Sequence, residues 1–192
     1  KTTSSQIARL ASEGCEIVRV AVPTAAAAEA LGEIVRNSPI PVVADIHFTG
    51  ELALKAIEAG VHCIRINPGN MRSKKSLARI AGAAADAGIP IRIGVNSGSV
   101  APGKRPSGDI VGLMVDTALD AARFLEECNF SDIIISAKCS DVQDTVSVYR
   151  ELARQTDYPL HLGVTAAGPF ASAVVRSAIG IGALLLEGIG DT

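Results

Sequence analysis

The chain has 192 residues, of which 48% are hydrophobic and 20% charged, and its formal net charge at pH 7 is −2. This balance is typical of a globular protein and excludes a disordered chain or a basic protein that coats nucleic acid. Aromatic residues make up only 3% and Trp is absent, which argues against a surface that stacks single-stranded bases. Apolar runs are too short to cross a bilayer. We therefore predict neither a nucleic-acid partner nor a membrane span.

The chain opens on a Ser/Thr-rich segment that is typical of the entry into a helix. Six short β-branched runs then alternate with segments of helical period that end at Gly or Asn. The expected strands cover residues 16–22, 41–47, 62–68, 90–96, 132–138 and 159–165. The expected helices between them cover residues 28–38, 50–60, 74–88, 109–129 and 142–157. Strands separated by helices imply parallel pairing and right-handed crossovers.

Two folds are built this way, the doubly wound open sheet and the (β/α)8 barrel. Residues two apart in a strand share a face, and in every run one parity carries polar groups near the C-terminal half while the other stays apolar. The polar positions are Arg19, Asp45, His47, Arg65, Asn67, Arg92, Asn96, Ser136, Lys138, His161 and Thr165. An open sheet covered by helices should be apolar on both faces. A barrel interior instead ends in an active site, so we predict an α/β fold, a (β/α)8 TIM barrel.

The inward-facing groups carry more positive than negative charge, because Arg19, Arg65, Arg92 and Lys138 stand against Asp45 alone. Buried ions are seldom left without partners, since desolvation costs several kcal/mol per ion. The planar fork of Arg binds two oxygens of a phosphate, and Lys adds a point charge. We therefore predict an anionic ligand with more than one phosphate or carboxylate.

Taken singly, these residues have plainer interpretations. A lone Arg in a strand is about as often an ion-paired or surface residue, and His161 is equally consistent with a hydrogen-bonded core imidazole. The turns at 67–70 and 96–99 follow strands directly, where barrel enzymes bind phosphate, but Gly, Asn, Pro and Ser also form ordinary loops. The loop 97–109 fits either a lid or a solvent loop. It is the recurrence over six strands that favours a ligand site.

The four cysteines, Cys15, Cys63, Cys128 and Cys139, lie far apart in the sequence. None shows a CxxC or other metal-type spacing, so we predict no metal bound by this chain. Their usage favours a reduced, intracellular compartment. Because no charged-then-apolar leader opens the chain, we expect a cytoplasmic protein, or one of the plastid stroma if the source has plastids.

Seven phrases make the chain recognisable: GCEIVRVAVP, VADIHF, CIRINPGN, IRIGVNSGS, ISAKCSDV, YPLHLGVT and SAIGIGALLLEGIGDT. In this order, over nearly the whole chain, they resemble the barrel domain of the 4-hydroxy-3-methylbut-2-enyl diphosphate synthase family, iron–sulfur oxidoreductases of the non-mevalonate isoprenoid pathway. The resemblance implies a two-electron reductive ring opening of 2-C-methyl-D-erythritol 2,4-cyclodiphosphate with loss of water. It also implies a [4Fe–4S] cluster bound by a domain absent from this chain, ferredoxin or flavodoxin as electron donor, and a homodimer.

The resemblance assigns roles to residues at matching motif positions. Asp45 and His47 are the candidate catalytic residues, which orient the polyol part of the substrate or relay protons. The candidate substrate-binding residues on these motifs are Arg19, Arg65, Asn67, Arg92, Asn96 and Lys138. Arg65, Arg92 and Lys138 would neutralise the diphosphate, with the two asparagines as neutral donors. The inward parity of the sixth run adds His161 and Thr165 as substrate-binding candidates.

The chain departs from the family at one acid. After the strand that ends in HLGV, the family usually reads Thr-Glu-Ala-Gly, whereas Ala166 stands here in place of Glu. That Glu is thought to handle protons or hydroxyl groups of the substrate, and losing a general acid–base costs about 10²–10⁴ in rate. Two other hypotheses therefore stay open. One is a non-catalytic barrel that binds a phosphate ligand in a degenerate site, and the other is an unrelated barrel enzyme acting on a pterin or a sugar phosphate.

The chain also differs from the family in how much of the family's sequence it covers. In the family the cluster is held by three cysteines and a glutamate in a separate C-terminal domain, and no such group of cysteines occurs here. We expect residues 1–192 to form one barrel domain, the central part of a longer enzyme, with the first and last strands at or beyond the chain ends. Alone, this segment is expected to be inactive.

Overall fold

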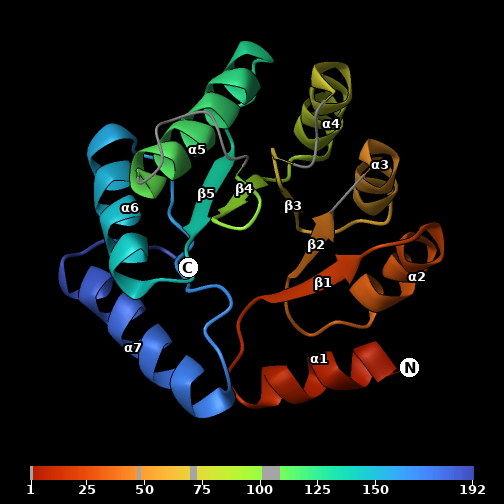
Figure 1. The fold of residues 1–192 in the computed structure, drawn as a ribbon. Coiled ribbons are helices and arrows are strands. Elements are labelled where there is room, and N and C mark those ends of the chain that lie inside the picture. Colours follow the sequence, from red (N-terminus) through yellow and green to blue (C-terminus); the bar gives the residue numbers. More distant parts are fainter. Residues whose placement is uncertain (1, 47–48, 70–72, 101–108) are drawn as a thin grey trace. The chain divides into compact units, whose positions relative to one another are not determined.

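Helices and strands alternate as predicted along the chain up to residue 155 (Figure 1). The structure is a computed structural model that describes residues 2–46, 49–69, 73–100 and 109–192. The candidate residue His47 and most of the loop 97–109 lie outside these ranges.

The described residues form five strands and seven helices. The strands are β1 (Val18–Val22), β2 (Val42–Ile46), β3 (Cys63–Ile66), β4 (Ile91–Asn96) and β5 (Ile133–Lys138). The helices are α1 (Thr2–Ser12), α2 (Ala25–Arg36), α3 (Gly50–Glu58), α4 (Lys74–Ala87), α5 (Ile110–Glu127), α6 (Val142–Gln155) and α7 (Phe170–Leu186). The strand order in the sheet is β1-β2-β3-β4-β5, with the parallel pairing expected of β/α units.

The sixth expected strand, residues 159–165, is wrong as a regular strand. Only an isolated parallel bridge between Ile135 and Leu160 forms here. The His161 N–H donates to the Ile135 carbonyl and the Leu162 N–H to the Thr192 carbonyl, so the segment divides its backbone hydrogen bonds between two neighbours. The segment therefore runs beside β5 without forming a continuous ladder.

Capping groups explain several of the helix boundaries. Thr24 precedes α2 and its hydroxyl accepts a hydrogen bond from the Ala27 N–H at 3.2 Å. Ser73 caps α4 in the same way, and Gly88 ends that helix in the left-handed conformation with φ of 63°. Asp141 caps α6. These residues satisfy backbone groups that a helix end leaves free.

The chain divides into two compact units, and β4 begins in the first and ends in the second. The first unit comprises residues 1–92 with 128–132, and the second comprises residues 93–127 with 133–192.

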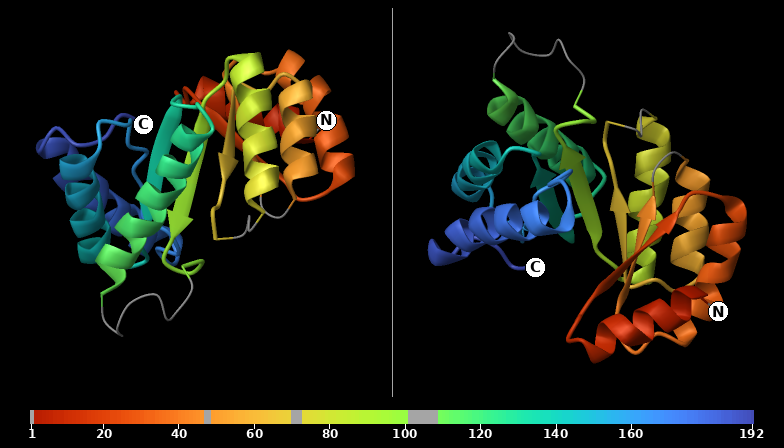
Figure 2. Two further views of the ribbon diagram at one scale, coloured as in Figure 1. Left: turned by 90° about the horizontal axis from the view of Figure 1, so that it is seen from above. Right: turned by 60° about the horizontal axis from the view of Figure 1, so that its bottom comes forward.

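In the first unit, α2, α3 and α4 lie side by side over one face of the strands (Figure 2). The register aligns Val22 with Ile46 and Ile46 with Ile66 on that face, and all three are buried. The opposite face carries Asp45 beside Arg65. The alternation predicted from the sequence is therefore confirmed for β1 to β3, and it places the charged groups away from the helices.

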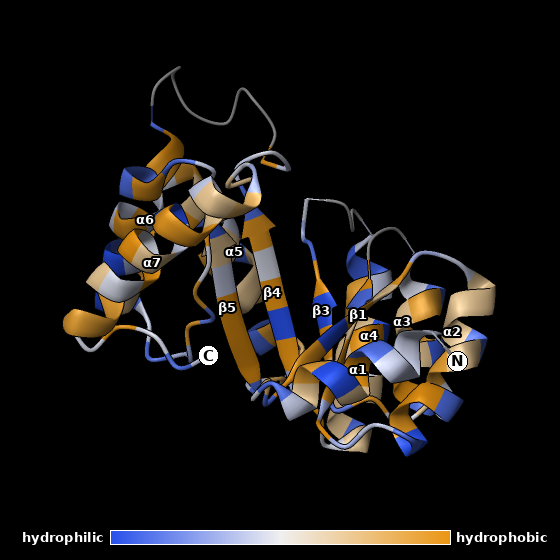
Figure 3. Cartoon of the chain, turned by 90° about the horizontal axis from the view of Figure 1, so that it is seen from below, coloured by the Kyte–Doolittle hydropathy of each residue, from blue (hydrophilic) through white to orange (hydrophobic). Residues whose placement is uncertain are grey.

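In the second unit, α5 and α6 pack on β5, and α7 packs on α6. Helix α7 is strongly apolar, as its orange colour in Figure 3 shows, and it leaves Phe170 and Leu186 largely exposed. No helix in the described part of the chain combines the length and apolarity needed to cross a lipid bilayer.

Candidate functional site

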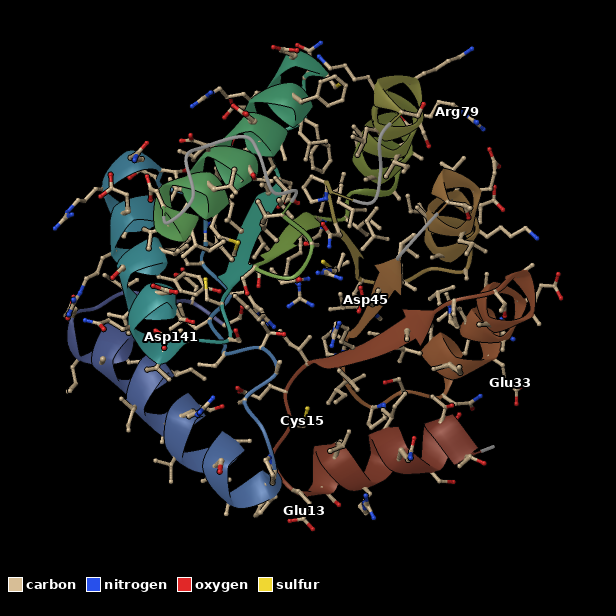
Figure 4. The ribbon with its side chains drawn as sticks, in the orientation of Figure 1. Glu13, Cys15, Glu33, Asp45, Arg79 and Asp141 are labelled. Carbon is tan, nitrogen blue, oxygen red and sulfur yellow. The ribbon has the colours of Figure 1, made fainter. Side chains whose placement is uncertain are left out.

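Asp45 on β2 is the centre of an ion-pair cluster in the first unit. Its Oδ1 accepts a hydrogen bond from Arg65 Nη1 at 2.9 Å, and its Oδ2 accepts one from Arg19 Nη1. The Asp45 side chain is only 3% exposed, whereas that of Arg65 is 13% and that of Arg19 52% exposed. Figure 4 shows Asp45 on the side of β2 turned away from α3. One buried carboxylate thus fixes two guanidinium groups through separate oxygens.

The strand register explains how these three side chains meet. Ala21 on β1 is aligned with Asp45, which in turn is aligned with Arg65 on β3. Arg19 lies two residues before Ala21 and so shares its face. Because the Ala21 side chain is only a methyl group, it leaves room for the Arg19 guanidinium to reach the carboxylate.

Arg92 brings a third guanidinium to this cluster and is 7% exposed. Burial lowers the pKa of Arg92, and the interaction with Cys63 partly opposes this shift. The positive charges of Arg19 and Arg65 lower the pKa of Arg92 further. The group stays protonated at neutral pH. Across the part of the chain that the structure describes, the guanidinium has no hydrogen-bonded or ion-paired partner. No fully buried side-chain nitrogen or oxygen in the described residues lacks a partner, so the Arg92 guanidinium reaches solvent. A mostly buried arginine whose guanidinium has no acceptor in the protein is the arrangement expected where an anionic ligand binds.

Sequence reasoning did not assign Cys63 to this cluster. Burial raises the pKa of the Cys63 thiol to about 11, although Arg92 partly opposes the shift. The thiol is therefore protonated at neutral pH and is neither a nucleophile nor a metal ligand there. The spacing in the sequence could have assigned it, because Cys63 lies two residues before Arg65 and residues two apart in a strand share a face.

Asn67 lies just beyond the end of β3 and is buried. Its side-chain Oδ1 accepts a hydrogen bond from the Gly69 N–H at 3.0 Å, which forms an Asx turn. Asn67 thus shapes the turn after β3. Its role as a donor to the ligand stays a prediction.

In the second unit, Lys138 at the end of β5 lies beside His161. The Lys138 Nζ is 3.5 Å from His161 Nε2, and His161 Nδ1 is 2.9 Å from Thr192 Oγ1. A Cβ at Gly163 would lie only 3.1–3.3 Å from Lys138 Cδ, Cε and Nζ. The absence of a side chain at Gly163 therefore provides the space that the lysine chain occupies.

Tyr149 on α6 is a functional candidate that sequence reasoning missed. Its side chain is fully buried, and its hydroxyl accepts a hydrogen bond from the Ala137 N–H at 3.1 Å and donates one to the His161 carbonyl at 2.6 Å. The helical spacing from Thr145 to Tyr149 to Leu152 marks the buried face of α6. Only tertiary structure shows which backbone groups the hydroxyl contacts.

Asn96 and Thr165 belong to the same unit as Lys138. Asn96 ends β4, and the next residue, Ser97, donates its N–H to the Lys138 carbonyl at 3.0 Å. Thr165 donates its N–H to the Cys139 carbonyl, also at 3.0 Å. The ends of β4, β5 and segment 159–165 are therefore joined by backbone hydrogen bonds.

The predicted site residues thus fall into two groups. The first unit brings together Arg19, Asp45, Arg65 and Arg92, with Asn67 at the end of β3. The second unit brings together Lys138 and His161, with Asn96 and Thr165 near them in the backbone network. That each of these residues binds substrate stays a prediction, as does the catalytic role of Asp45 and His47.

The cysteines in this chain do not fit a [4Fe–4S] cluster. All four are free thiols, and burial raises the pKa of both Cys63 and Cys139 to about 11, whereas cluster ligands are thiolates. Within the described ranges, no group of three or more His, Cys, Asp or Glu side chains could hold a metal ion.

Ala166, which replaces the family Glu, is exposed and has a left-handed backbone with φ of 49°. This conformation costs about 1–2 kcal/mol for any residue with a Cβ. Because Glu would bear the same cost, nothing in the backbone explains why Ala stands here.

Solved structures with a similar fold include dihydropteroate synthases. That of Xanthomonas albilineans matches with a TM-score of 0.68 and 18% identity over 96% of this chain and 74% of that chain. That of Yersinia pestis matches with a TM-score of 0.63 and 13% identity over 93% and 76%. At these identities the similarity concerns the fold alone.

Curated relatives are far more similar in sequence. A protein of Geobacter sulfurreducens is 50% identical over 99% of this chain and 54% of its own length, and one of Clostridium acetobutylicum is 49% identical over 100% and 56%. Both are named 4-hydroxy-3-methylbut-2-en-1-yl diphosphate synthase (flavodoxin). The chain spans about half the length of these relatives. The family described as the GcpE TIM-barrel domain matches residues 1–192. This chain therefore belongs to the GcpE TIM-barrel domain family.

Proposed function

We propose that this chain is the substrate-binding barrel of a 4-hydroxy-3-methylbut-2-en-1-yl diphosphate synthase. In the longer protein the reaction is the reductive ring opening of 2-C-methyl-D-erythritol 2,4-cyclodiphosphate, with two electrons taken up and water lost. The names of relatives about 50% identical over nearly the whole chain support this activity. The observation that carries it is Arg92, a mostly buried residue whose guanidinium has no ion-paired partner in the described part of the chain and lies near two further arginines.

The arginine cluster suits the phosphate groups of this substrate. Arg65 and Arg92 would donate to phosphate oxygens, and their burial strengthens the attraction because nearby water is excluded. Asp45 would act as a positioning residue, since both of its oxygens already accept hydrogen bonds from Arg65 and Arg19. Fixing the two guanidinium groups before the ligand arrives lowers the entropic cost of binding.

The remaining candidates would supply weaker contacts. Lys138 adds a point charge for a phosphate, and Asn67, Asn96 and Thr165 are neutral groups for phosphate or hydroxyl oxygens. His47 remains the candidate for moving a proton near the polyol part of the substrate.

Electrons would come from flavodoxin, which the names of the relatives include, or from ferredoxin. A [4Fe–4S] cluster, which supplies single electrons when bound, would be held by protein other than this chain, because the described cysteines do not fit one. A homodimer would let one protomer carry the cluster to the barrel of the other. The barrel residues themselves would bind and orient the cyclodiphosphate.

Calorimetry with the cyclodiphosphate tests the proposal. The double variant Arg65→Ala, Lys138→Ala should bind at least about 10²-fold more weakly, because each lost charge-assisted hydrogen bond is worth about 1.5–3 kcal/mol. The matched control Lys55→Ala, Arg79→Ala removes two cations from the outer surfaces of α3 and α4, where both are about half exposed. The control should bind as the unmodified protein does. Equal binding by the site variant would remove the basis of the proposal.

Ala166 favours a second candidate function, a non-catalytic barrel that binds the phosphate ligand. Introducing Ala166→Glu into the longer, cluster-bearing protein separates the two candidates. A gain in turnover supports the enzyme, since a carboxyl group restores proton transfer. Unchanged turnover with intact binding favours the binding protein.

A further inference from the structure

We infer that His161 is a positioning residue, which holds the Lys138 ammonium group through an unprotonated Nε2 while the imidazole proton is on Nδ1. We name this arrangement the Lys138 cradle, formed by Tyr149, His161 and Gly163. The part of the inference that concerns ligand affinity rests on the proposed function. The protonation state of His161 does not.

Two contacts of the His161 ring support this protonation state. An ammonium group only donates hydrogen bonds, so in a hydrogen bond with Lys138 Nζ, which lies 3.5 Å away, the Nε2 atom presents its lone pair. The Nδ1 atom then carries the proton and donates to Thr192 Oγ1 at 2.9 Å. An imidazolium would place two positive charges side by side, and the tautomer protonated on Nε2 would set one donor against another.

The backbone of His161 is held from two directions. Its N–H donates to the Ile135 carbonyl at 2.8 Å, and its own carbonyl accepts from the buried Tyr149 hydroxyl at 2.6 Å. The same hydroxyl accepts from the N–H of Ala137, the residue before Lys138. Tyr149 therefore fixes the backbone beside Lys138 relative to the backbone of His161.

Gly163 completes the cradle by leaving space. The Lys138 chain passes so close to Gly163 that a Cβ there would lie 3.1–3.3 Å from its last three atoms, tighter than ordinary van der Waals contact. His161 and Gly163 lie two residues apart, on the same side of an extended segment. One of them contacts the ammonium group, and the other makes room for the chain that carries it.

This arrangement has a consequence for anion binding. A lysine side chain has many rotamers and loses freedom when it binds a phosphate. Holding the ammonium group in advance reduces that loss. Removing His161 should therefore weaken binding only while Lys138 is present, whereas a residue that contacts the ligand directly would act regardless of Lys138.

Nuclear magnetic resonance tests the protonation state directly. Long-range ¹H–¹⁵N correlation spectra at pH 7.5 distinguish the two neutral tautomers and the imidazolium, and the His161 signals are those absent from His161→Gln. We expect the tautomer protonated on Nδ1. The tautomer protonated on Nε2, or an imidazolium, would overturn the inference.

A double-mutant cycle with the cyclodiphosphate tests the mode of action. His161→Leu should weaken binding about tenfold, equal to 1.4 kcal/mol, while His161→Gln, whose Oε1 can accept from Lys138, should stay within about threefold. In a Lys138→Met background, His161→Leu should change nothing further. An equal loss in that background would contradict a positioning role.

The same data separate this inference from the proposed function. If Lys138→Met binds the cyclodiphosphate normally, the proposed role of Lys138 in substrate binding fails, and the spectra alone decide the state of His161. Circular dichroism verifies that each variant is folded. If His161→Leu does not fold, His161→Gln and the spectra still decide.

Discussion

The arginine cluster of the first unit and the Lys138 cradle of the second present positive charge in different ways. In the cluster, guanidinium groups are held by a negative charge, because the buried Asp45 carboxylate forms ion pairs with both Arg19 and Arg65. In the cradle, one ammonium group lies beside a neutral imidazole ring, in the space that a glycine leaves open. A carboxylate can fix several cations at once, but the folded state then depends on its charge.

Removing the carboxylate should give the largest effect on stability. Asp45→Asn removes the carboxylate charge that pairs with the largely buried Arg65, and we expect a loss of about 3 kcal/mol, the lower end for a broken buried pair because Arg19 is half exposed. Urea unfolding measures this loss. The control Glu51→Gln removes an exposed carboxylate that pairs with Arg79 and should change stability by less than about 0.5 kcal/mol. Equal midpoints for both variants would show that Asp45 does not hold the cluster.

Raising the pH should destabilise both units through their buried thiols, with a smaller effect for each thiol than for Asp45→Asn. Burial raises the pKa of Cys63 and of Cys139 from 9.0 to about 11. Below pH 9 both states keep the proton, so there is no effect. As the pH rises from 9 toward 11, the unfolded thiol ionises first and stability falls.

At pH 10.5 each thiol should contribute about 2 kcal/mol to this alkaline loss. The measurement is urea unfolding at pH 8 and pH 10.5 for the unmodified protein, for Cys63→Ala and for Cys139→Ala. Each variant should lose correspondingly less stability between the two pH values. An identical alkaline loss in all three proteins would mean that the thiols ionise as readily in the folded state as in the unfolded state.

Filling the space beside Lys138 should give the smallest change. Gly163→Ala places a methyl group against a flexible side chain, so we expect stability to change by less than about 1 kcal/mol, the cost of a small shift in packing. Affinity for the cyclodiphosphate should fall about threefold to tenfold, because Lys138 is displaced. Gly182→Ala on α7 is the matched control, since no atom lies within 4 Å of its added Cβ. If both variants bind alike, Gly163 has no role in placing Lys138.

Local patterns predicted much of the fold, and long-range contacts explain what they missed. Alternation along β2 and β3 correctly placed Asp45 and Arg65 on one face, and Gly88 ends α4 as expected. The strand at 159–165 was wrong because its apolar pattern predicts an extended segment but not its backbone partners, and the hydrogen bonds of this segment are divided between Ile135 and Thr192.

The supporting residues could not be predicted in the same way. The contacts of Tyr149 with Ala137 and His161 join segments 12 residues away on either side of it, and no spacing rule predicts them. The use of Gly163 as space for Lys138 likewise depends on tertiary packing. Charged residues in a strand can be recognised as site candidates from the sequence alone. The residues that position them, such as Tyr149 and Gly163, have the same residue types as ordinary core and turn residues.

The location of the phosphate groups in a crystal structure of the protein with the cyclodiphosphate tests the central claim most directly. We predict phosphate oxygens at about 2.7–2.9 Å from guanidinium nitrogens of Arg65 and Arg92, the range of charge-assisted hydrogen bonds. The contrary result is a ligand elsewhere, for example in the groove of about 540 Å³ lined by Arg150 and Arg154 on α6, with the Arg92 guanidinium still without an acceptor.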